Sequence, residues 1–513
     1  MESIFDIQFI SILLVCPISL LFLHLIFFKK SPPNDQCVHL PPSPPSLPLV
    51  GHLHLLVSTH LPARLKNLSS KYGPLLYLRF LGFPVVLVSS ASVAYQVFRT
   101  EDVNFSNHSV ATLDDSLFLG PYSFMASPYG DYWKFVKKLL ATDLLGPNHL
   151  ARSRRLRAEE FDRFYIYLLE KATRGELVDI AVEIRKLSNK IVCNMIMGQK
   201  CSEENGTEEK LGGLAKKSIH LCGKIFTAKG LRSISRFGAS LLEREVREAS
   251  RTYDELLEKS LKEHEENPDR EHKDMMDMLL EACQNEKAPY KITRNQIKSI
   301  FVDLLFGTND SPPASVSWTM AELMNHPDVF RKLRKEIEFI VGKTRVLEET
   351  DLQNLPYLQA VVKEGLRLYP PTFFLPRKCQ EGCEIGGYYI PKNTTVVLNL
   401  YGIMRDPSSW EDPDEFRPER FLESTRNTRE CDYKEHALKH IPFGSGRRRC
   451  PGANLANIVM ETAIGRMVQC FDWKIHGGKV NMEPTNNGFM EMRHPLLMTP
   501  VLHFHPLPST QYD

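Results

Sequence analysis

The sequence lacks an excess of charge of either sign, and this absence excludes one large class of proteins. Its 513 residues include 64 Lys and Arg against 62 Asp and Glu, so the formal net charge is only +2. Proteins that bind nucleic acids usually carry a strong basic excess or a basic stripe. Internal repeats and long low-complexity tracts are also absent. We therefore expect a folded, enzyme-like chain with no nucleic-acid partner.

The sequence also lacks the cysteine pattern of a disulfide-rich or zinc-binding protein. Its 11 cysteines are odd in number and scattered, without the paired spacing of a disulfide framework or a zinc site. Disulfides are rare in the cytosol, where thiols are kept reduced. The number and spacing of the cysteines therefore predict a cytosolic domain in which most of them are buried, reduced thiols.

One long hydrophobic run is present, near the amino end. Residues 9–28 contain no Asp, Glu, Lys or Arg, and about 20 apolar residues can cross a bilayer as a helix. Lys29 and Lys30 follow directly, whereas the charged residues before the run are acidic, so the positive-inside rule places the rest of the chain in the cytosol. A cleaved signal peptide would instead have its basic residues before the apolar run. We expect residues 1–30 to be a single-pass membrane anchor.

The segment after this anchor is rich in proline. Residues 31–50 include the stretch LPPSPPSLP, and repeated prolines favour a stiff polyproline conformation over a helix. We expect residues 31–50 to form a hinge. It is either a rigid strut that orients the globular part on the bilayer or an ordinary linker.

The rest of the chain, residues 51–513, shows no internal domain boundary and is predicted to be mainly helical. Apolar residues recur at helical spacing in residues 159–170, 241–264, 297–324, 329–340 and 358–368. Two runs rich in aromatic and β-branched residues, 75–88 and 388–400, predict strands. The polar stretch 262–273 predicts an exposed loop. The expected architecture is a large helical domain with a small β region near its amino end.

The strongest motif is IPFGSGRRRCPG at residues 441–452. Its cysteine, Cys450, follows three arginines and precedes an apolar segment that predicts a helix. Nearby positive charge and a helix N-terminus both favour a thiolate. The glycines allow close approach of a flat ligand, against which Phe443 could pack, and Arg448 could pair with a carboxylate on it. The alternative interpretation is a buried structural cysteine.

This motif resembles the haem-binding loop of cytochrome P-450 monooxygenases, Phe-x-x-Gly-x-Arg-x-Cys-x-Gly, at every fixed position. Two further motifs precede it in the family's order: Glu364-x-x-Arg367, with both charges on one helical face, and Arg420 in FRPERF. The resemblance implies a cytochrome P-450 fold for residues 51–513 and a haem b with Cys450 as its axial thiolate ligand. It gives the triad of Glu364, Arg367 and Arg420 a structural role.

The resemblance also implies contacts with the haem propionates. Trp133 and Lys137 match the family's Trp-x-x-x-Arg, although lysine keeps only the charge and loses the bidentate fork of arginine. Arg377 matches a propionate-binding arginine, and residues 372–375 beside it are expected to face the substrate. The predicted cofactor-binding residues are Trp133, Lys137, Arg377, Phe443, Arg448 and Cys450.

The family's oxygen-binding groove is altered in this chain. Its pattern Ala/Gly-Gly-x-Asp/Glu-Thr-Thr/Ser aligns with GTNDSP, in which Asp310 and Ser311 form the acid–alcohol pair. Such a pair can relay protons to iron-bound dioxygen. Thr308 replaces the second glycine, and Pro312 and Pro313 follow the serine. Because proline removes a helical hydrogen bond and clashes with the preceding turn, the alternative is a helix break without a working relay.

Over its whole length the chain resembles plant endoplasmic-reticulum members of the family, in particular a crucifer subfamily that modifies triterpenoids and is related to flavonoid and pterocarpan oxidases. The resemblance implies a monooxygenase of that membrane, facing the cytosol, which uses O2 and electrons from NADPH–cytochrome P-450 reductase to hydroxylate or desaturate a hydrophobic plant metabolite. The alternatives are a haem-thiolate isomerase or dehydratase that needs no O2, and an inactive haem-binding paralogue. Five basic residues are candidates for docking the reductase, with ordinary solvated charge as the alternative: Lys134, Lys137, Lys138, Arg447 and Arg449.

Overall fold

The computed structural model describes residues 39–48, 50–56, 60–109, 113–114, 116–203, 206–230, 236–267, 273–284, 290–423, 438–475, 477–485 and 489–505, together with positions 17 and 19. Apart from those two positions, the predicted anchor (1–30) lies outside the described residues, as does the first part of the predicted hinge (31–50). Within the described ranges, no helix is long and apolar enough to cross a membrane.

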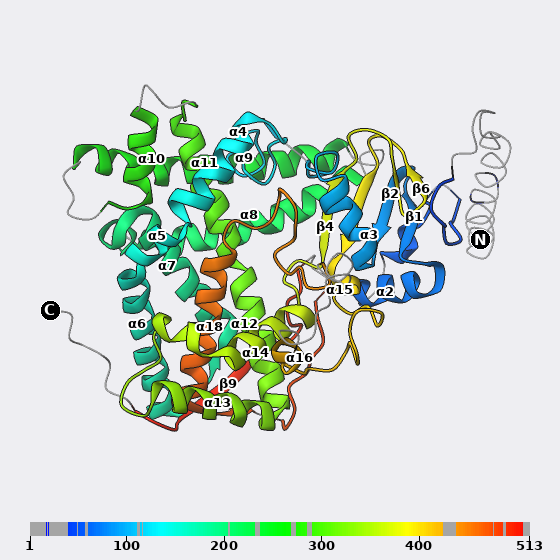
Figure 1. The fold of residues 1–513 in the computed structure, drawn as a ribbon. Coiled ribbons are helices and arrows are strands. Elements are labelled where there is room, and N and C mark those ends of the chain that lie inside the picture. Colours follow the sequence, from blue (N-terminus) through cyan, green and yellow to red (C-terminus); the bar gives the residue numbers. More distant parts are fainter. Residues whose placement is uncertain are drawn as a thin grey trace, which may run out of the picture.

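Helices dominate the described structure (Figure 1), as the sequence pattern predicted. They are α2 (Leu61–Tyr72), α3 (Ala91–Tyr95), α4 (Asp131–Leu139), α5 (Pro147–Arg152), α6 (Arg154–Arg174), α7 (Ile180–Glu203), α8 (Thr207–Gly230), α9 (Arg236–Glu266), α10 (Met275–Gln284), α11 (Arg294–Asn309), α12 (Ser311–Asn325), α13 (Pro327–Val341), α14 (Pro356–Leu368), α15 (Leu400–Ile403), α16 (Arg420–Glu423) and α18 (Ala453–Cys470). Four predicted helices lie within α6, α9, α13 and α14. The predicted loop at 262–273 is wrong at its start, because α9 continues to Glu266.

The strands form one larger sheet and two small ones. They are β1 (Leu75–Phe80), β2 (Phe83–Val88), β3 (Val178–Asp179), β4 (Phe374–Lys378), β5 (Cys383–Ile385), β6 (Tyr388–Ile390), β7 (Thr395–Asn399), β8 (Phe471–Ile475) and β9 (Leu497–Leu502). The larger sheet has the order β1-β2-β7-β4, and β2 pairs with β7 in parallel. The prediction of a sheet near the amino end was therefore only partly right. Parallel strands need a long crossover, and β7, with its antiparallel neighbour β4, comes from much later in the chain.

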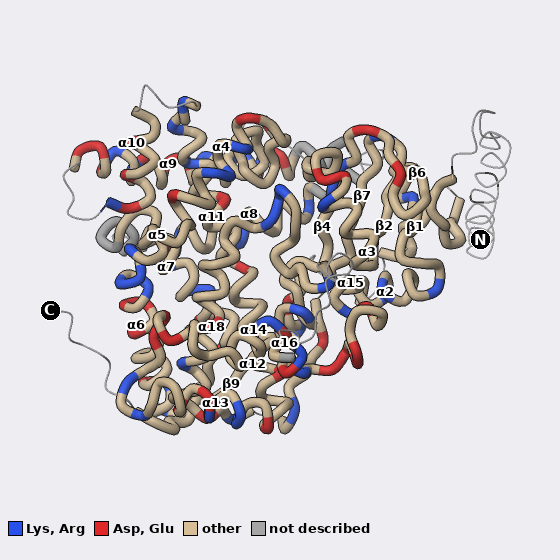
Figure 2. The backbone as a smooth tube through the Cα atoms, viewed as in Figure 1, with Lys and Arg blue, Asp and Glu red and all other residues tan. Residues whose placement is uncertain are grey.

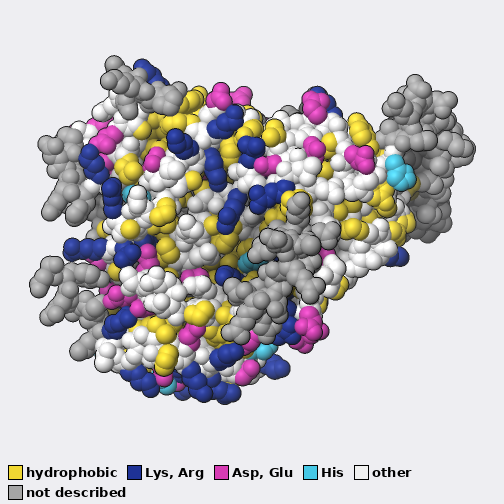
Figure 3. Space-filling model, in the orientation of Figure 1, with side chains coloured by type: hydrophobic (Ala, Val, Ile, Leu, Met, Phe, Trp, Pro, Cys, Tyr) yellow, Lys and Arg dark blue, Asp and Glu magenta, His cyan; other side chains and the backbone are white. Residues whose placement is uncertain are grey.

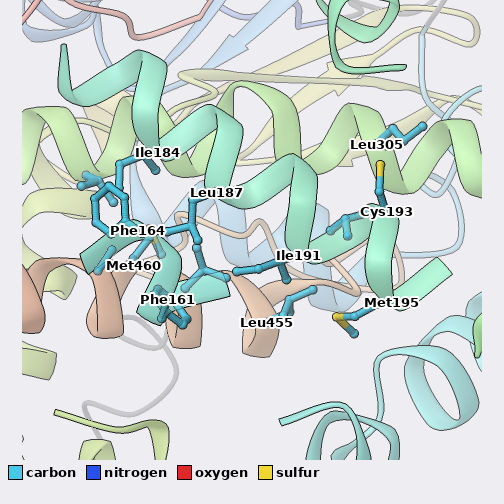
Figure 4. Close-up of a cluster of buried hydrophobic side chains, with 14 of the residues drawn as sticks. Phe161, Phe164, Ile184, Leu187, Ile191, Cys193, Met195, Leu305, Leu455 and Met460 are labelled. Atoms are coloured by element: carbon cyan, nitrogen blue, oxygen red, sulfur yellow. The ribbon is translucent and has the colours of Figure 1, made fainter. Parts of the chain in front are cut away.

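The main hydrophobic core lies where α6 and α7 pack on α11 and α18 (Figure 4). Phe161 and Phe164 of α6 lie beside Ile184 and Leu187 of α7, and Met460 of α18 belongs to the same cluster. Each fully buried side chain of this size contributes about 1.5–3 kcal/mol. This packing fixes α18, whose N-terminal end follows the Cys450 loop directly.

The predicted single helix over residues 297–324 is wrong in one respect, because the structure has two helices that meet at Asp310. α11 begins with a capping box, in which the Thr293 side chain accepts from the N–H of Gln296 and the Gln296 side chain accepts from the N–H of Thr293. Asp310 ends α11 with φ −118° and ψ −30°. The physical reason is the pair of prolines at the start of α12, which supply no N–H to a continuous helical ladder.

A buried ion triad joins α14 to the segment that leads into α16. Arg367 forms a bidentate pair with Glu364, with Nε and Nη2 2.7 and 2.8 Å from its two carboxylate oxygens. Arg420 Nε donates to the same carboxylate at 2.9 Å. The side chains of Glu364 and Arg367 are fully buried. The three motif residues therefore meet, as the sequence motifs predicted.

Glu364→Ala is expected to lower the stability of the fold sharply, because it leaves two buried guanidinium groups without their carboxylate. Breaking a buried pair from one side typically costs about 3–5 kcal/mol. The urea midpoint of unfolding measures the effect. Glu411→Ala is the matched control: it removes an exposed partner of Arg417 and is expected to cost less than about 1 kcal/mol. Equal midpoint shifts for the two variants would contradict the assigned role of the triad.

Candidate functional site

Cys450 lies in a tight loop that leads directly into α18. Its N–H donates to the carbonyl of Phe443 at 3.0 Å, which closes the loop on itself. Gly444 and Gly446 have φ of +68° and +69°, in the left-handed region that glycine adopts without strain. A Cβ on Gly446 would also lie 2.5 Å from Oδ1 of Asp102. The loop thus requires glycine at position 446 for two independent reasons.

The surroundings of Cys450 shift the pKa of its thiol in opposite directions. Its side chain is exposed, yet desolvation by the protein around it raises the pKa of the thiol, against the lowering effects of the Gly452 backbone, Lys137 and Arg449. Lys137 and Arg449 thus favour the thiolate, as the sequence predicted, and burial of the thiol opposes them. A coordinated metal ion deprotonates a thiol outright, so an iron bound at this sulfur would stabilise the thiolate against the effect of burial.

Arg448 is buried two residues before Cys450 and is held by three backbone carbonyls. Its Nε donates to Ser106 at 2.7 Å, Nη1 to Phe124 at 3.0 Å and Nη2 to Ser127 at 2.6 Å. Its guanidinium carbon lies 4.3 Å from the centroid of Trp133 on α4. One side chain thereby joins the cysteine loop to the segment before α4.

Arg377 of β4 is the second buried arginine near this loop. Burial lowers the pKa of Arg377 to about 10. Burial, followed by the charge of Arg377, lowers the pKa of Arg448 to about 9. Within the described structure neither arginine has a carboxylate ion-pair partner, and the buried indole Nε1 of Trp133 has no acceptor. A flat group with two carboxylates, such as haem, fits these donors and supplies the missing negative charge.

His108 is a residue of this site that the sequence did not indicate. Its Nδ1 lies 2.8 Å from the carbonyl oxygen of Met125. Burial and then the charges of Arg377 and Arg448 hold the pKa of His108 well below its usual value, so both arginines act on its ring through their charge. A single histidine in a loop has no spacing that marks it as functional, and only the folded chain brings it here.

The remaining predicted cofactor residues lie around the cysteine loop. Phe443 is half-buried against the main core. Nζ of Lys137 donates to the carbonyl of Arg449 at 2.5 Å, so this lysine contacts the loop beside Cys450. In the segment predicted to face the substrate, Phe373 is buried in a hydrophobic cluster with Trp318 and Met490, directly before β4 begins.

The segment before α4 is held from its other side by Asp303 of α11. The carboxylate of Asp303 accepts from Oγ of Ser123 at 2.8 Å and from the N–H of Phe124 at 2.5 Å. Burial raises the pKa of Asp303 to about 7 in spite of these bonds. The carbonyls that bind Arg448 are thus fixed between α11 and the cysteine loop.

Asp310 and Ser311 lie at the junction of α11 and α12. Oδ1 of Asp310 accepts from the Asn309 side chain at 2.7 Å and lies 3.4 Å from Nε of Arg185 on α7. Burial raises the pKa of Asp310, and Arg185 opposes this effect. The carbonyl of Ser311 accepts from Oγ of Ser315 at 2.9 Å. Asp310 therefore carries a carboxyl group held between the two helices and α7.

The two prolines interrupt the helix only locally. They occupy the first turn of α12, where a helix does not need their N–H groups, and the Ala314 N–H donates to the Asp310 carbonyl at 3.1 Å. The Asn309 carbonyl, four residues before Pro313, accepts from Nε of Arg185 at 3.1 Å. Oγ1 of Thr308 donates to carbonyls of its own helix, at 3.2 Å. The junction is thus a hydrogen-bonded bend.

Comparisons with known proteins agree over nearly the whole chain. A family model described as Cytochrome P450 matches residues 41–500. Cytochrome P450 705A22 of Arabidopsis thaliana is 51% identical over 512 residues, 99% of each chain. The 3,9-dihydroxypterocarpan 6A-monooxygenase of Glycine max is 36% identical, over 97% of this chain and 99% of that one. A solved zebra fish cytochrome P450 with progesterone has a TM-score of 0.72 at 23% identity, over 86% of this chain and 99% of that chain.

Arg448→Lys is expected to reduce haem retention several-fold while leaving the rest of the fold intact. Lysine keeps the charge, but its single ammonium group cannot hold three diverging carbonyls as the planar guanidinium does. The ratio of bound haem to protein in the purified protein measures the effect. Arg449→Lys changes an exposed neighbour and should leave that ratio unchanged. Equal haem content in the two variants would argue against a special role for Arg448.

Proposed function

The chain belongs to the cytochrome P450 family of haem-thiolate oxidoreductases, and from this we propose that it is a membrane-anchored monooxygenase of the endoplasmic reticulum that oxidises a hydrophobic plant metabolite. Its catalytic domain would face the cytosol and receive electrons from NADPH–cytochrome P-450 reductase. The observation that carries the proposal is the meeting of the Cys450 loop with two buried arginines that have no carboxylate partner among the described residues.

In this proposal each residue of the site has one task. Cys450 would bind the haem iron through its thiolate, and Phe443 would pack beside the haem. Arg377, Arg448 and the Trp133 indole would hold the two propionates. When bound, haem with an axial thiolate supplies the activation of dioxygen. Lys137 steadies the ligand loop through the Arg449 carbonyl, and is therefore proposed as a loop contact.

Asp310 and Ser311 are the proposed proton donors of the reaction. A carboxyl group whose pKa is raised by burial holds a proton closer to neutral pH, which suits it to general acid catalysis. Arg185 limits that rise and keeps the carboxyl group oriented. The side chain of Ser311 is half-buried beside it. This acid–alcohol pair and the intact cysteine loop favour oxygen chemistry over the isomerase and inactive-paralogue alternatives.

The membrane orientation is supported by the second half of the hinge. The His39 carbonyl accepts from the Tyr389 N–H at 2.9 Å, and the Pro42 carbonyl accepts from the Tyr77 N–H at 2.8 Å. Residues 39–48 are thus bonded to the sheet region, which favours a strut over a free linker. Leu47 and Phe83, about half exposed, add apolar surface at the same end of the molecule.

The reductase is proposed to dock on the basic surface over the cysteine loop. Lys and Arg residues lie around α4 and on the loop that leads into α18 (Figure 2), and Lys and Arg side chains gather on this face of the molecule (Figure 3). Arg447 and Lys134 have acidic neighbours in Asp102 and Asp131. Lys138 and Arg449, which are exposed, are therefore the better candidates for pairing with an acidic partner surface.

The substrate is proposed to be a triterpenoid or a flavonoid-like compound, supported by the pterocarpan monooxygenase among the relatives.

Cys450→Ser is expected to abolish the thiolate signature, because a hydroxyl group is a far weaker iron ligand than a thiolate. The measurement is the difference spectrum of the reduced protein with and without carbon monoxide. Unsubstituted protein should give the Soret band of thiolate ligation. A band typical of histidine ligation in the unsubstituted protein would refute the proposal.

The reaction class is tested by NADPH-dependent product formation with reductase and candidate triterpenoids. Conversion of the substrate without NADPH would select the isomerase.

Ser311→Ala is expected to reduce product formation on the order of 10²-fold, the usual contribution of a positioned proton donor. NADPH consumption should fall much less, since electron delivery does not need the hydroxyl group. The ratio of product to NADPH consumed is the measurement, and Ser315→Ala, one turn further along α12, is the control. An unchanged ratio in Ser311→Ala would remove this serine from the proposed proton route.

A further inference from the structure

Cys379 and Cys383 meet in the turn that follows β4. Cys379 comes directly after that strand and Cys383 begins β5. Each thiol shifts the pKa of the other, as two sulfurs that lie close together do. Sγ of Cys379 lies 2.9 Å from the Glu381 carbonyl and 3.9 Å from the Ile390 carbonyl. Ile390 is the direct partner of Cys383 in the β5–β6 ladder. These contacts hold the Cys379 sulfur against the start of β5.

The turn between the two cysteines is fixed by Asn104. Its Oδ1 accepts from the N–H groups of Gln380 and Glu381 at 3.0 and 2.8 Å, and its Nδ2 donates to the Glu381 carbonyl at 2.8 Å. Gly382 completes the turn, since a Cβ there would lie 2.1 Å from Oη of Tyr389. The hydrogen-bonded turn therefore holds the two cysteines close together.

The two thiols differ in the way that a redox pair requires. Cys379 is fully buried and Cys383 is half-buried. Their interaction lowers the pKa of Cys383 and raises that of Cys379. Cysteines that react with peroxides are accessible, have thiolate character and often lie beside a second, resolving cysteine. Cys383 fits the first role and Cys379 the second.

We propose that Cys379 and Cys383 are a reversible disulfide site, oxidised by hydrogen peroxide. The Cys383 thiolate attacks one peroxide oxygen, the O–O bond breaks, and the other oxygen leaves as water after taking up a proton. The Cys379 sulfur then attacks the Cys383 sulfenic acid, the S–S bond forms, and a second water leaves. In sum, two thiols and one hydrogen peroxide give one disulfide and two waters. This step is independent of the monooxygenase reaction.

The site lies next to the haem-binding residues. Cys379 is two residues beyond Arg377, and the Lys378 N–H between them donates to the Asn107 carbonyl at 2.9 Å. That carbonyl lies in the same segment as the Ser106 carbonyl, which accepts from Arg448. A disulfide here would form beside the hydrogen-bonded backbone segments that position Arg377 and Arg448.

The test uses the full-length chain and peptide mapping. Reduced protein is treated with hydrogen peroxide, its remaining thiols are alkylated, and it is digested with trypsin under non-reducing conditions. Cleavage after Lys378 and Lys392 places both cysteines in one peptide. This peptide should lose two hydrogen atoms and take up no alkylating agent, and dithiothreitol should restore both thiols. Cys222 and Cys283, single half-buried cysteines, serve as controls and should remain alkylated.

Two variants separate a redox pair from chance oxidation. In Cys379→Ser the reaction should stop at Cys383 sulfenic acid, detected with a dimedone label. In Cys383→Ser the buried Cys379 should stay alkylatable after unfolding. Two alkylated thiols in the peroxide-treated wild-type peptide would overturn the proposal. So would a disulfide from Cys383 to any other cysteine, or oxidation of Cys222 and Cys283 to the same extent.

Discussion

The site depends on the burial of two positive charges close together, neither of which has a carboxylate ion-pair partner among the described residues. Arg448 is held by three carbonyls and Arg377 lies beside it, and burial lowers the pKa of both. Carbonyl dipoles offset part of the desolvation cost, but the net charge remains until a dianionic group binds. The same arginine ties the cysteine loop to the segment before α4, so cofactor binding and the local fold are stabilised by one interaction.

A second constraint is the bend at Asp310, where α11 ends and α12 begins. The prolines remove two donors, and Arg185 bonds one of the freed carbonyls while lying beside the Asp310 carboxylate. The hydrogen bond lost at the Asn309 carbonyl because of Pro313 is thus replaced by one from Arg185, more than a hundred positions away. The bend holds the Asp310 carboxyl group against Asn309 and Arg185, directly before Ser311 begins α12.

Much of the site could be predicted from local patterns. The loop around Cys450, the Glu364–Arg367 pair and the helix after Gly452 are short-range features, and the structure has them as expected. The sequence did not reveal contacts between distant segments: the larger sheet takes two strands from late in the chain, Phe373 packs beside Trp318, and burial opposes the nearby positive charge at Cys450. The scattered cysteines gave no sign of a pair, yet Cys379 and Cys383 lie close enough for each thiol to shift the pKa of the other.

By itself, the sequence determined the family, the helical class and the identity of the ligand loop. These features depend on residue types at short, fixed spacings, and such spacings determine local backbone structure. Only the tertiary structure decided that His108 joins the arginine pocket, that Arg185 supports the bend at Asp310, and that Cys379 faces Cys383. These contacts depend on burial and on the pairing of remote strands and helices. Desolvation and long-range packing act through space, and no spacing along the chain encodes them.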